Sequence, residues 1–236
     1  MYVFLRPNNF FNKLQKRRNA EHLLLNSVGL VPATIDLDIN TVMRGFSKGD
    51  SNISGKYSLS LSLVTRPPIV SLTGQDYCPF KEKICNVDAP HHLALVVSDS
   101  YEGHIYSAMI AVIGFELRGS SVIVYQIQGG RIKPKEDDKN IEFKKHVGKV
   151  RKWILSRLNW EQLLVYVIEE WARLNGFSKV KIQCADDNTW RQETQAILNI
   201  QDSSRNERID KHYDQIAEIS GYRRGMNYWN KTMVSV

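Results

Sequence analysis

The segment from Arg157 to Gln183 constrains the fold more than any other part of the chain. Its apolar residues recur at intervals of three and four, which predicts an amphipathic helix with one buried face. Asn159 stands before this pattern as an expected N-cap with Gln162 as its capping-box partner, and Asn175-Gly176 follows it as a stop. Phe177–Cys184 is then predicted to be a strand. The apolar stripe comprises Trp160, Leu163, Leu164, Val167, Ile168 and Trp171.

Several strands are expected before this helix. Tyr57–Val64 alternates strictly between apolar and polar residues, as a half-buried strand does. Three more strand candidates follow, and the glycine-containing turns between them predict an antiparallel meander. They are His92–Ser98, Ile105–Glu116 and Ser121–Gln128.

The helix also predicts how two strands pair. It connects Val122–Gln128 to Lys179–Cys184, and a helical crossover normally joins parallel strands of one sheet. We therefore expect an α/β fold with a mixed, mainly antiparallel central sheet and flanking helices. The predicted domain spans residues 91–236. Residues 1–90 are an N-terminal part, either an added lobe or the first elements of the same domain.

The remaining segments are less regular. Gly129–Lys152 contains glycines, a proline and many charges, which predicts a surface excursion with a short helix near its end. Asp186–Glu207 is polar and is expected to be a loop. A second short helix is predicted from about Arg208 to Ser220, and Tyr222–Val236 is predicted to close the fold as a hairpin.

Composition narrows the class of protein. Three cysteines in 236 residues are too few for a disulfide framework, which favours a reducing, cytoplasmic location. No stretch reaches the roughly 20 apolar residues of a membrane-spanning helix, so no membrane partner is expected. The net charge of +7 favours anionic partners such as nucleotides, phosphates or nucleic acid. An ordinary soluble surface explains the same charge equally well.

The order of elements resembles the GNAT superfamily of acyl-CoA-dependent N-acyltransferases over about residues 91–236. LLVYVIEEWARLNGFSKVKIQ is similar to the central helix and following strand of that family. YDQIAEISGYRRGMNYWNKTM is similar to its last helix and closing strands. The resemblance implies transfer of an acyl group from acetyl-CoA, or another acyl-CoA, to an amine of a small molecule or a protein.

The resemblance also implies a site. The strand that ends at Gly130 would pair with the pantetheine arm, and the following helix start would receive the phosphates. Glu116 would accept the proton of the amine, and Tyr213 would protonate the sulfur in place of a tyrosine that the family places nearer its glycine, here Ala217. The implied donor-binding residues are Tyr125, Ile127, Gly129, Gly130, Arg131, Arg157 and Asn159.

One part of the chain departs from the family. The expected phosphate turn, Leu155–Glu161, contains no glycine, and Glu161 brings a negative charge that would repel a phosphate. A non-catalytic module of the same fold, which binds another ligand or a protein, is therefore an alternative. A nucleic-acid-binding protein is less favoured and rests on net charge and on the basic segment Lys133–Trp153.

No metal is expected. Cys78 and Cys85 precede His91 and His92, but six residues separate the two cysteines, whereas zinc fingers use two to four. Adjacent histidines in a strand point to opposite faces, so only one of them could join such a site. Cys184 is expected to be a core residue.

Overall fold

The computed structural model describes residues 39–49, 53, 56–64, 73–74, 89–130, 141–188, 207 and 209–233. Arg131, Cys78, Cys85 and most of the loop expected over 186–207 lie outside the described residues. The strands are β1 (Ser58–Val64), β2 (Thr73–Gly74), β3 (His91–Tyr101), β4 (His104–Arg118), β5 (Ser121–Gly129), β6 (Lys179–Gln183), β7 (Arg223–Arg224) and β8 (Tyr228–Thr232). The helices are α3 (Ile39–Phe46), α4 (Ile141–Arg157), α5 (Trp160–Leu174), a 3-10 turn η1 (Ala185–Asp187), a π-helical turn η2 (Lys211–Gln215) and α8 (Ile216–Ile219).

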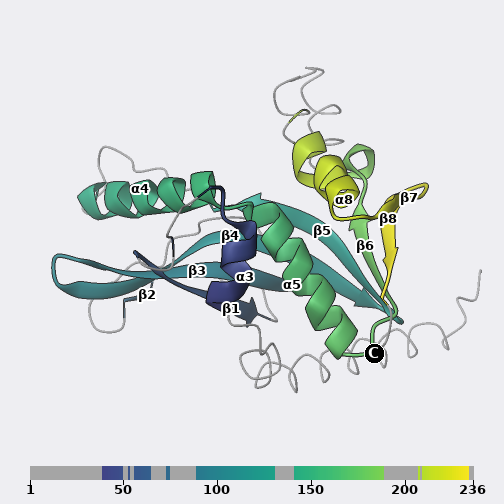
Figure 1. The fold of residues 1–236 in the computed structure, drawn as a ribbon, viewed down its shortest axis with the longest axis horizontal. Coiled ribbons are helices and arrows are strands. Elements are labelled where there is room, and N and C mark those ends of the chain that lie inside the picture. Colours follow the sequence, from purple (N-terminus) through teal and green to yellow (C-terminus); the bar gives the residue numbers. More distant parts are fainter. Residues whose placement is uncertain are drawn as a thin grey trace, which may run out of the picture.

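The strands form one eight-stranded sheet with the order β1-β3-β4-β5-β6-β8-β7, and β2 pairs with β4 off this path (Figure 1). Among the described strands, only β5 and β6 pair in parallel. The predicted α/β class with a mixed, mainly antiparallel sheet is confirmed. The predicted meander corresponds to β3, β4 and β5.

The predicted parallel crossover is also confirmed. Ser121 of β5 pairs with Lys179 of β6, and the ladder continues to Val124 opposite Ile182. Helix α5 makes the crossover and lies on the same face of the sheet as α3 (Figure 1). No helix among the described residues is long and apolar enough to cross a membrane.

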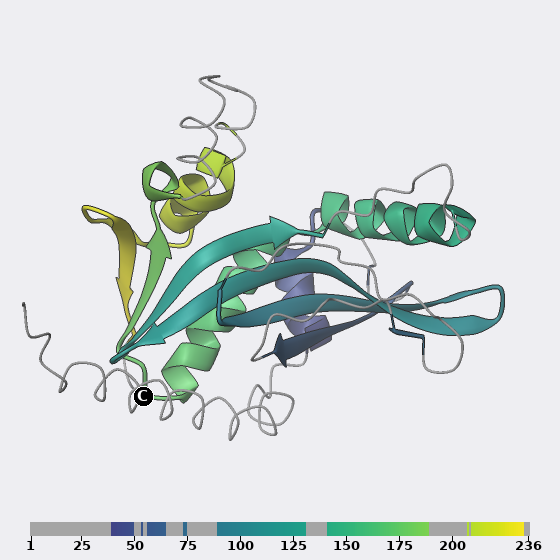
Figure 2. The ribbon, with the colours of Figure 1, turned by 180° about the vertical axis from the view of Figure 1, so that it is seen from behind.

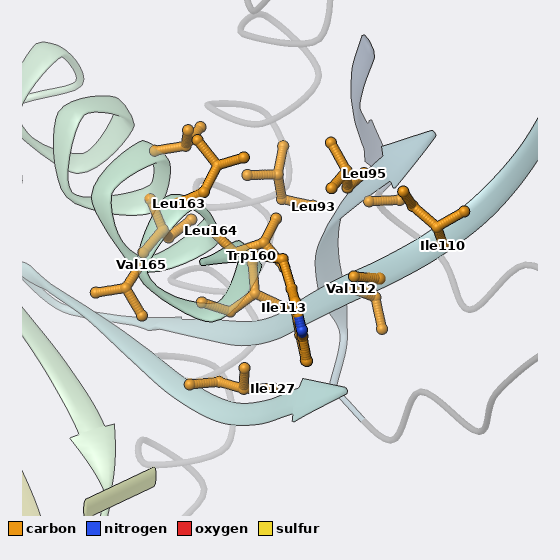
Figure 3. Close-up of a cluster of buried hydrophobic side chains, with 14 of the residues drawn as sticks. Leu93, Leu95, Ile110, Val112, Ile113, Ile127, Trp160, Leu163, Leu164 and Val165 are labelled. Atoms are coloured by element: carbon orange, nitrogen blue, oxygen red, sulfur yellow. The ribbon is translucent and has the colours of Figure 1, made fainter. Parts of the chain in front are cut away.

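The predicted stripe of α5 is the centre of the core. Leu163, Leu164 and Val167 have no exposed surface, and Trp160 faces Ile113 and Ile127 of the sheet in Figure 3. The helix is buried on a second side as well, because α3 packs against it through Phe46 and Tyr166, whose rings lie 5.5 Å apart.

Two described strands that precede residue 91, β1 and β2, join the same sheet. Strand β1 pairs with β3 from Ser58 opposite Ser98 to Val64 opposite His92. Among residues 1–90, the described elements α3 and β1 therefore pack with the later elements around one core.

The helix expected near the end of Gly129–Lys152 is present, but it is longer and more buried than predicted. Residues 131–140 of that segment lie outside the described residues. Helix α4 has 17 residues and buries Phe143, Val147, Val150 and Ile154, which are spaced by four, three and four. Because charged residues lie between these positions, the composition of the segment does not reveal its helical periodicity. Because α4 continues to Arg157, the turn before α5 is shorter than the predicted Leu155–Glu161.

The predicted capping box was wrong. Asn159 occupies the N-cap position of α5, but its side chain makes no capping hydrogen bond. Instead, the Asn159 N–H donates to Phe46 O at 2.8 Å, and the Lys48 N–H donates to Arg157 O at 2.7 Å. A segment from the N-terminal part of the chain therefore fixes the turn that a capping side chain was expected to fix.

Candidate active site at the fork between two parallel strands

The parallel strands β5 and β6 part after four residue pairs. Beyond the last pair, Val124 opposite Ile182, β5 continues to Gly129 while β6 ends at Gln183. We call this opening the fork. A β-bulge lies at its base, since Phe115 faces Val124 but Gly114 faces Gln126, which leaves Tyr125 as the extra residue. Bulges bend a strand and end its pairing, and this accounts for the divergence.

Tyr213 closes the fork. Its hydroxyl donates to the carbonyl oxygen of Tyr125 at 3.0 Å and accepts from the N–H of Ile127 at 3.4 Å. Those two backbone groups would have bonded to β6 if the strands had stayed together. The side chain is only 7% exposed. The phenol therefore takes the place of a strand at the hydrogen-bonding edge of β5.

Tyr213 is positioned by a short helical segment with π-helical geometry, η2. Asp214 anchors this segment by accepting from the Ala185 N–H at 2.9 Å and from Trp229 Nε1 at 2.8 Å. Arg224 also donates to this carboxylate. Burial acts to raise the pKa of Asp214, but these hydrogen bonds outweigh it and hold the pKa below its ordinary value. π-Helical turns recur at functional sites, because they redirect one side chain within a helix.

The start of α5 faces the same segment. Glu161 Oε1 lies 3.2 Å from Nδ1 of His212, and the His212 ring lies 5.7 Å from that of Trp160. The first turn of α5 thus carries a carboxylate, and a histidine of η2 lies beside it.

Arg151 of α4 approaches the far end of β5. A Cβ on Gly129 would lie 3.5 Å from Arg151 Nη2, 3.5 Å from Leu155 Cδ1 and 3.7 Å from Trp160 Cζ2. Gly129 thus lies against a guanidinium group and two apolar side chains. The sequence indicated no role for Arg151, because no local pattern shows which residues of this helix reach the end of β5.

The structure brings together some of the predicted site residues and separates others. Tyr125, Ile127 and Tyr213 meet at the fork, with Gly129 at the end of the strand. Gly130 turns towards β4, where its N–H donates to Ile110 O at 2.8 Å. Arg157 and Asn159 are engaged elsewhere, because their backbones pair with Lys48 and Phe46, and the Arg157 guanidinium lies 4.4 Å from the centre of the Trp153 ring.

Glu116 lies on the face of the sheet opposite to α5. Its neighbour Phe115 contacts Trp171 of α5 with ring centres 5.5 Å apart, and successive side chains of a strand point to opposite faces. Both carboxylate oxygens of Glu116 lie 3.3 Å from Nη2 of Arg118. Arg118 Nη2 also donates to the Tyr125 hydroxyl at 3.3 Å, so Glu116 is linked to the residue at the base of the fork.

No known protein family, characterised protein or solved structure matches this chain. The described residues contain no group of three or more His, Cys, Asp or Glu side chains placed to hold a metal ion. The side chains and strand edge of the fork supply three groups that could take part in chemistry. These are a phenol, a backbone N–H donor and a nearby carboxylate.

Proposed function

We propose that this protein is a divergent N-acyltransferase of the GNAT type, which transfers an acyl group from acyl-CoA to an amine. The observation that carries the proposal is the fork. A parallel strand pair, joined by α5, parts at a bulge and leaves backbone hydrogen-bonding groups of β5 that bond to Tyr213 instead of to β6. An extended chain with amide groups fits such an edge, because it can pair with a strand.

The pantetheine arm of acyl-CoA is such a chain. It would lie along β5 from Tyr125 towards Gly129 and share the strand edge with the Tyr213 hydroxyl. The turn before α5 does not suit the phosphates, since its N–H at Asn159 is bonded to Phe46 O and Glu161 adds a negative charge. The Arg151 guanidinium beside Gly129 suits them better and, in this proposal, takes the role first expected of Arg157 and Asn159.

Transfer would proceed by direct attack. The amine nitrogen forms a bond to the thioester carbonyl carbon while the carbon–sulfur bond breaks. The nitrogen proton passes to the Glu116 carboxylate, and the Tyr213 phenol gives its proton to the departing sulfur. The Ile127 N–H, which donates to the Tyr213 hydroxyl in this structure, would turn to the thioester carbonyl oxygen and stabilise its negative charge. Water then carries the proton from Glu116 back to the phenolate, which restores both groups.

A non-catalytic module of the same fold is the second candidate, and one observation favours it. Tyr213 already satisfies the strand edge, with distances of 3.0 and 3.4 Å to two backbone groups, so the fork is closed without a ligand. In that case the fork would be structural, and acyl-CoA would not bind.

Calorimetric titration with acetyl-CoA, together with thermal unfolding, separates the two candidates. An acyltransferase should bind the donor, and a donor concentration 100 times Kd should stabilise the protein by about 2.7 kcal/mol. Tyr213→Phe should lower kcat by about 10²- to 10⁴-fold, because it removes the acid, with little change in KM for the donor. Tyr166→Phe, which removes a hydroxyl from α5, is the control and should leave kcat unchanged.

Two results would count against the enzyme. The first is no heat of binding and no thermal shift at millimolar acetyl-CoA. The second is equal activity of wild type and Tyr213→Phe, which would remove the proposed acid from the mechanism.

A further inference from the structure

A cluster of charged and aromatic side chains lies on the face of the sheet opposite to α5. In Figure 2, β4 and β5 pass in front of α5, so the view looks onto this face. Glu116 pairs with Ile123 of β5, and Ile123 pairs with Lys181 of β6. Residues directly opposite each other share a face of a sheet, so Glu116 and Lys181 point the same way with one strand between them. We call this set the acceptor cluster; it comprises Glu116, Arg118, Tyr125, Lys181 and Tyr228.

The acceptor cluster is held together by polar contacts. Arg118 Nη2 bonds to Glu116 and to the Tyr125 hydroxyl, each at 3.3 Å. Burial raises the pKa of Tyr125, and so does a hydrogen bond with Tyr228. The Lys181 ammonium lies 5.8 Å from the centre of the Tyr228 ring. Two cations therefore flank a pair of tyrosines, with a single carboxylate among them.

The charges of this cluster are not balanced. Arg118 contacts Glu116 and Tyr125 through Nη2, and its side chain is 62% exposed, so its guanidinium is accessible to a ligand. Lys181 forms no ion pair with any of the described residues, and its ammonium lies over the Tyr228 ring. Guanidinium and ammonium groups in such a setting bind carboxylates.

The acceptor cluster adjoins the fork through Tyr125. The phenol of this residue belongs to the cluster, while its carbonyl oxygen accepts from Tyr213 in the fork. Along β5, Tyr125 stands two residues beyond Ile123, the partner of Glu116, which is roughly 7 Å of strand. Glu116 and the base of the fork are thus separated by about the length of a small molecule, so an acceptor bound beside Glu116 could reach a thioester at the fork.

We propose that the acceptor is a small amine that also carries a carboxylate, such as an amino acid. This inference rests on the proposed acyl transfer and names its acceptor. Lys181 and Arg118 bind the carboxylate, Glu116 faces the amine, and the two tyrosines contact the carbon chain between them. Arg118 and Lys181 are specificity residues and take no part in moving protons.

The test uses amino acids, each paired with the amine that lacks its carboxylate, for example phenylalanine with phenethylamine. Acetyl transfer by the full chain is followed by release of the CoA thiol. Across the panel, the best amino acid should have a kcat/KM at least about 10-fold above that of its paired amine. Lys181→Gln and Arg118→Gln should each lower this ratio by about 10- to 100-fold, mainly by raising KM for the amino acid.

Arg173→Gln is the matched control, because Arg173 also pairs with a nearby glutamate, Glu170, but on α5. It should leave the preference unchanged. Equal kcat/KM for both members of every pair would overturn the inference, and so would Lys181→Gln and Arg118→Gln variants that lower the rates of both members equally.

A second measurement separates this inference from the proposed function. Ligand-detected NMR, without any acyl-CoA, reports whether the amino acids of the panel bind and whether Lys181→Gln abolishes that binding. Binding that depends on Lys181 would support the carboxylate site even if acetyl-CoA were neither bound nor consumed. Absence of binding by every amino acid, with acetyl-CoA bound and transferred to simple amines, would overturn the inference and leave the enzyme standing.

Discussion

Tyr213 of η2 and His92 of β3 are both buried, but they differ in how their polar atoms are satisfied. The Tyr213 hydroxyl bonds twice to the backbone of β5. His92 of β3 has no exposed surface, and neither ring nitrogen has a hydrogen-bond partner among the described residues. Burial, with a smaller contribution from His91, lowers the pKa of His92 to about 4. His92 is therefore neutral in the folded protein near neutral pH, and its protonation would destabilise the folded state.

His92 should make the protein sensitive to acid. In the unfolded chain a histidine titrates near its ordinary pKa of about 6.5, and in the folded chain His92 titrates near 4. Between these values the unfolded state binds the extra proton, so the free energy of unfolding falls as the pH falls. From pH 7.5 to pH 4.5 the loss should be about 2 to 3 kcal/mol.

Urea unfolding of wild type and His92→Leu at several pH values checks this prediction. The variant should lose this part of the pH dependence, whereas His104→Leu, at an exposed position, should keep it. Parallel pH profiles for wild type and His92→Leu would contradict the assignment.

At the scale of elements, α4 shows how a charged helix is fixed to a sheet. Asp99 of β3 accepts from the Tyr106 hydroxyl at 3.1 Å and lies 3.3 Å from Nε2 of His146 on α4. The His146 ring lies 5.0 Å from that of Tyr101, and Phe143 packs edge-on against Tyr106 at 5.2 Å. One carboxylate and four rings therefore join α4 to the β3–β4 hairpin.

Removal of that carboxylate should loosen α4. Asp99→Ala should lower the free energy of unfolding by about 1 to 3 kcal/mol. Tyr106 is only 2% exposed, and its hydroxyl loses its acceptor in this variant. Glu142→Ala is the control, since it removes an exposed carboxylate on α4 paired with Lys145 and should change stability much less than Asp99→Ala. Urea denaturation measures both, and equal effects would refute a special role for Asp99.

At the scale of the whole molecule, the sheet consists of two antiparallel parts joined by the short parallel ladder of β5 and β6. Helix α5 reinforces this junction. The ring centre of Trp171 lies 5.5 Å from that of Phe115 on β4 and 5.6 Å from that of Phe177, the residue shortly before β6. One indole therefore contacts both sides of the junction.

Truncation of Trp171 should weaken the whole fold rather than one part of it. Trp171→Ala should lower the free energy of unfolding by about 3 to 5 kcal/mol, as for other large core aromatics. Trp171→Phe should cost much less, because it keeps a ring between Phe115 and Phe177 and removes an indole N–H that has no hydrogen-bond partner within the described parts of the chain. Far-ultraviolet circular dichroism and tryptophan fluorescence should give one coincident transition. Two separate transitions would show that the parts of the sheet unfold independently.

The sequence alone determined the elements with a clear period. The stripe from Trp160 to Trp171 and the alternation of Tyr57–Val64 identify buried faces, because side-chain direction repeats every 3.6 residues in a helix and every two in a strand. The connection by α5 then implied the parallel pairing of β5 with β6. These inferences depend only on neighbours along the chain, and the structure confirms them.

Only the tertiary structure decided the site. Tyr213 meets the backbone of Tyr125, 88 positions away, and Phe46 fixes the turn at Asn159. No local period encodes such contacts, since they depend on where packing places distant segments. The length of α4 is not evident from the sequence because charged residues dominate its composition, and its four buried apolar side chains are identified only by their packing in the structure. Periodicity specifies which faces are buried, whereas the packing of those faces decides which polar groups meet at the fork.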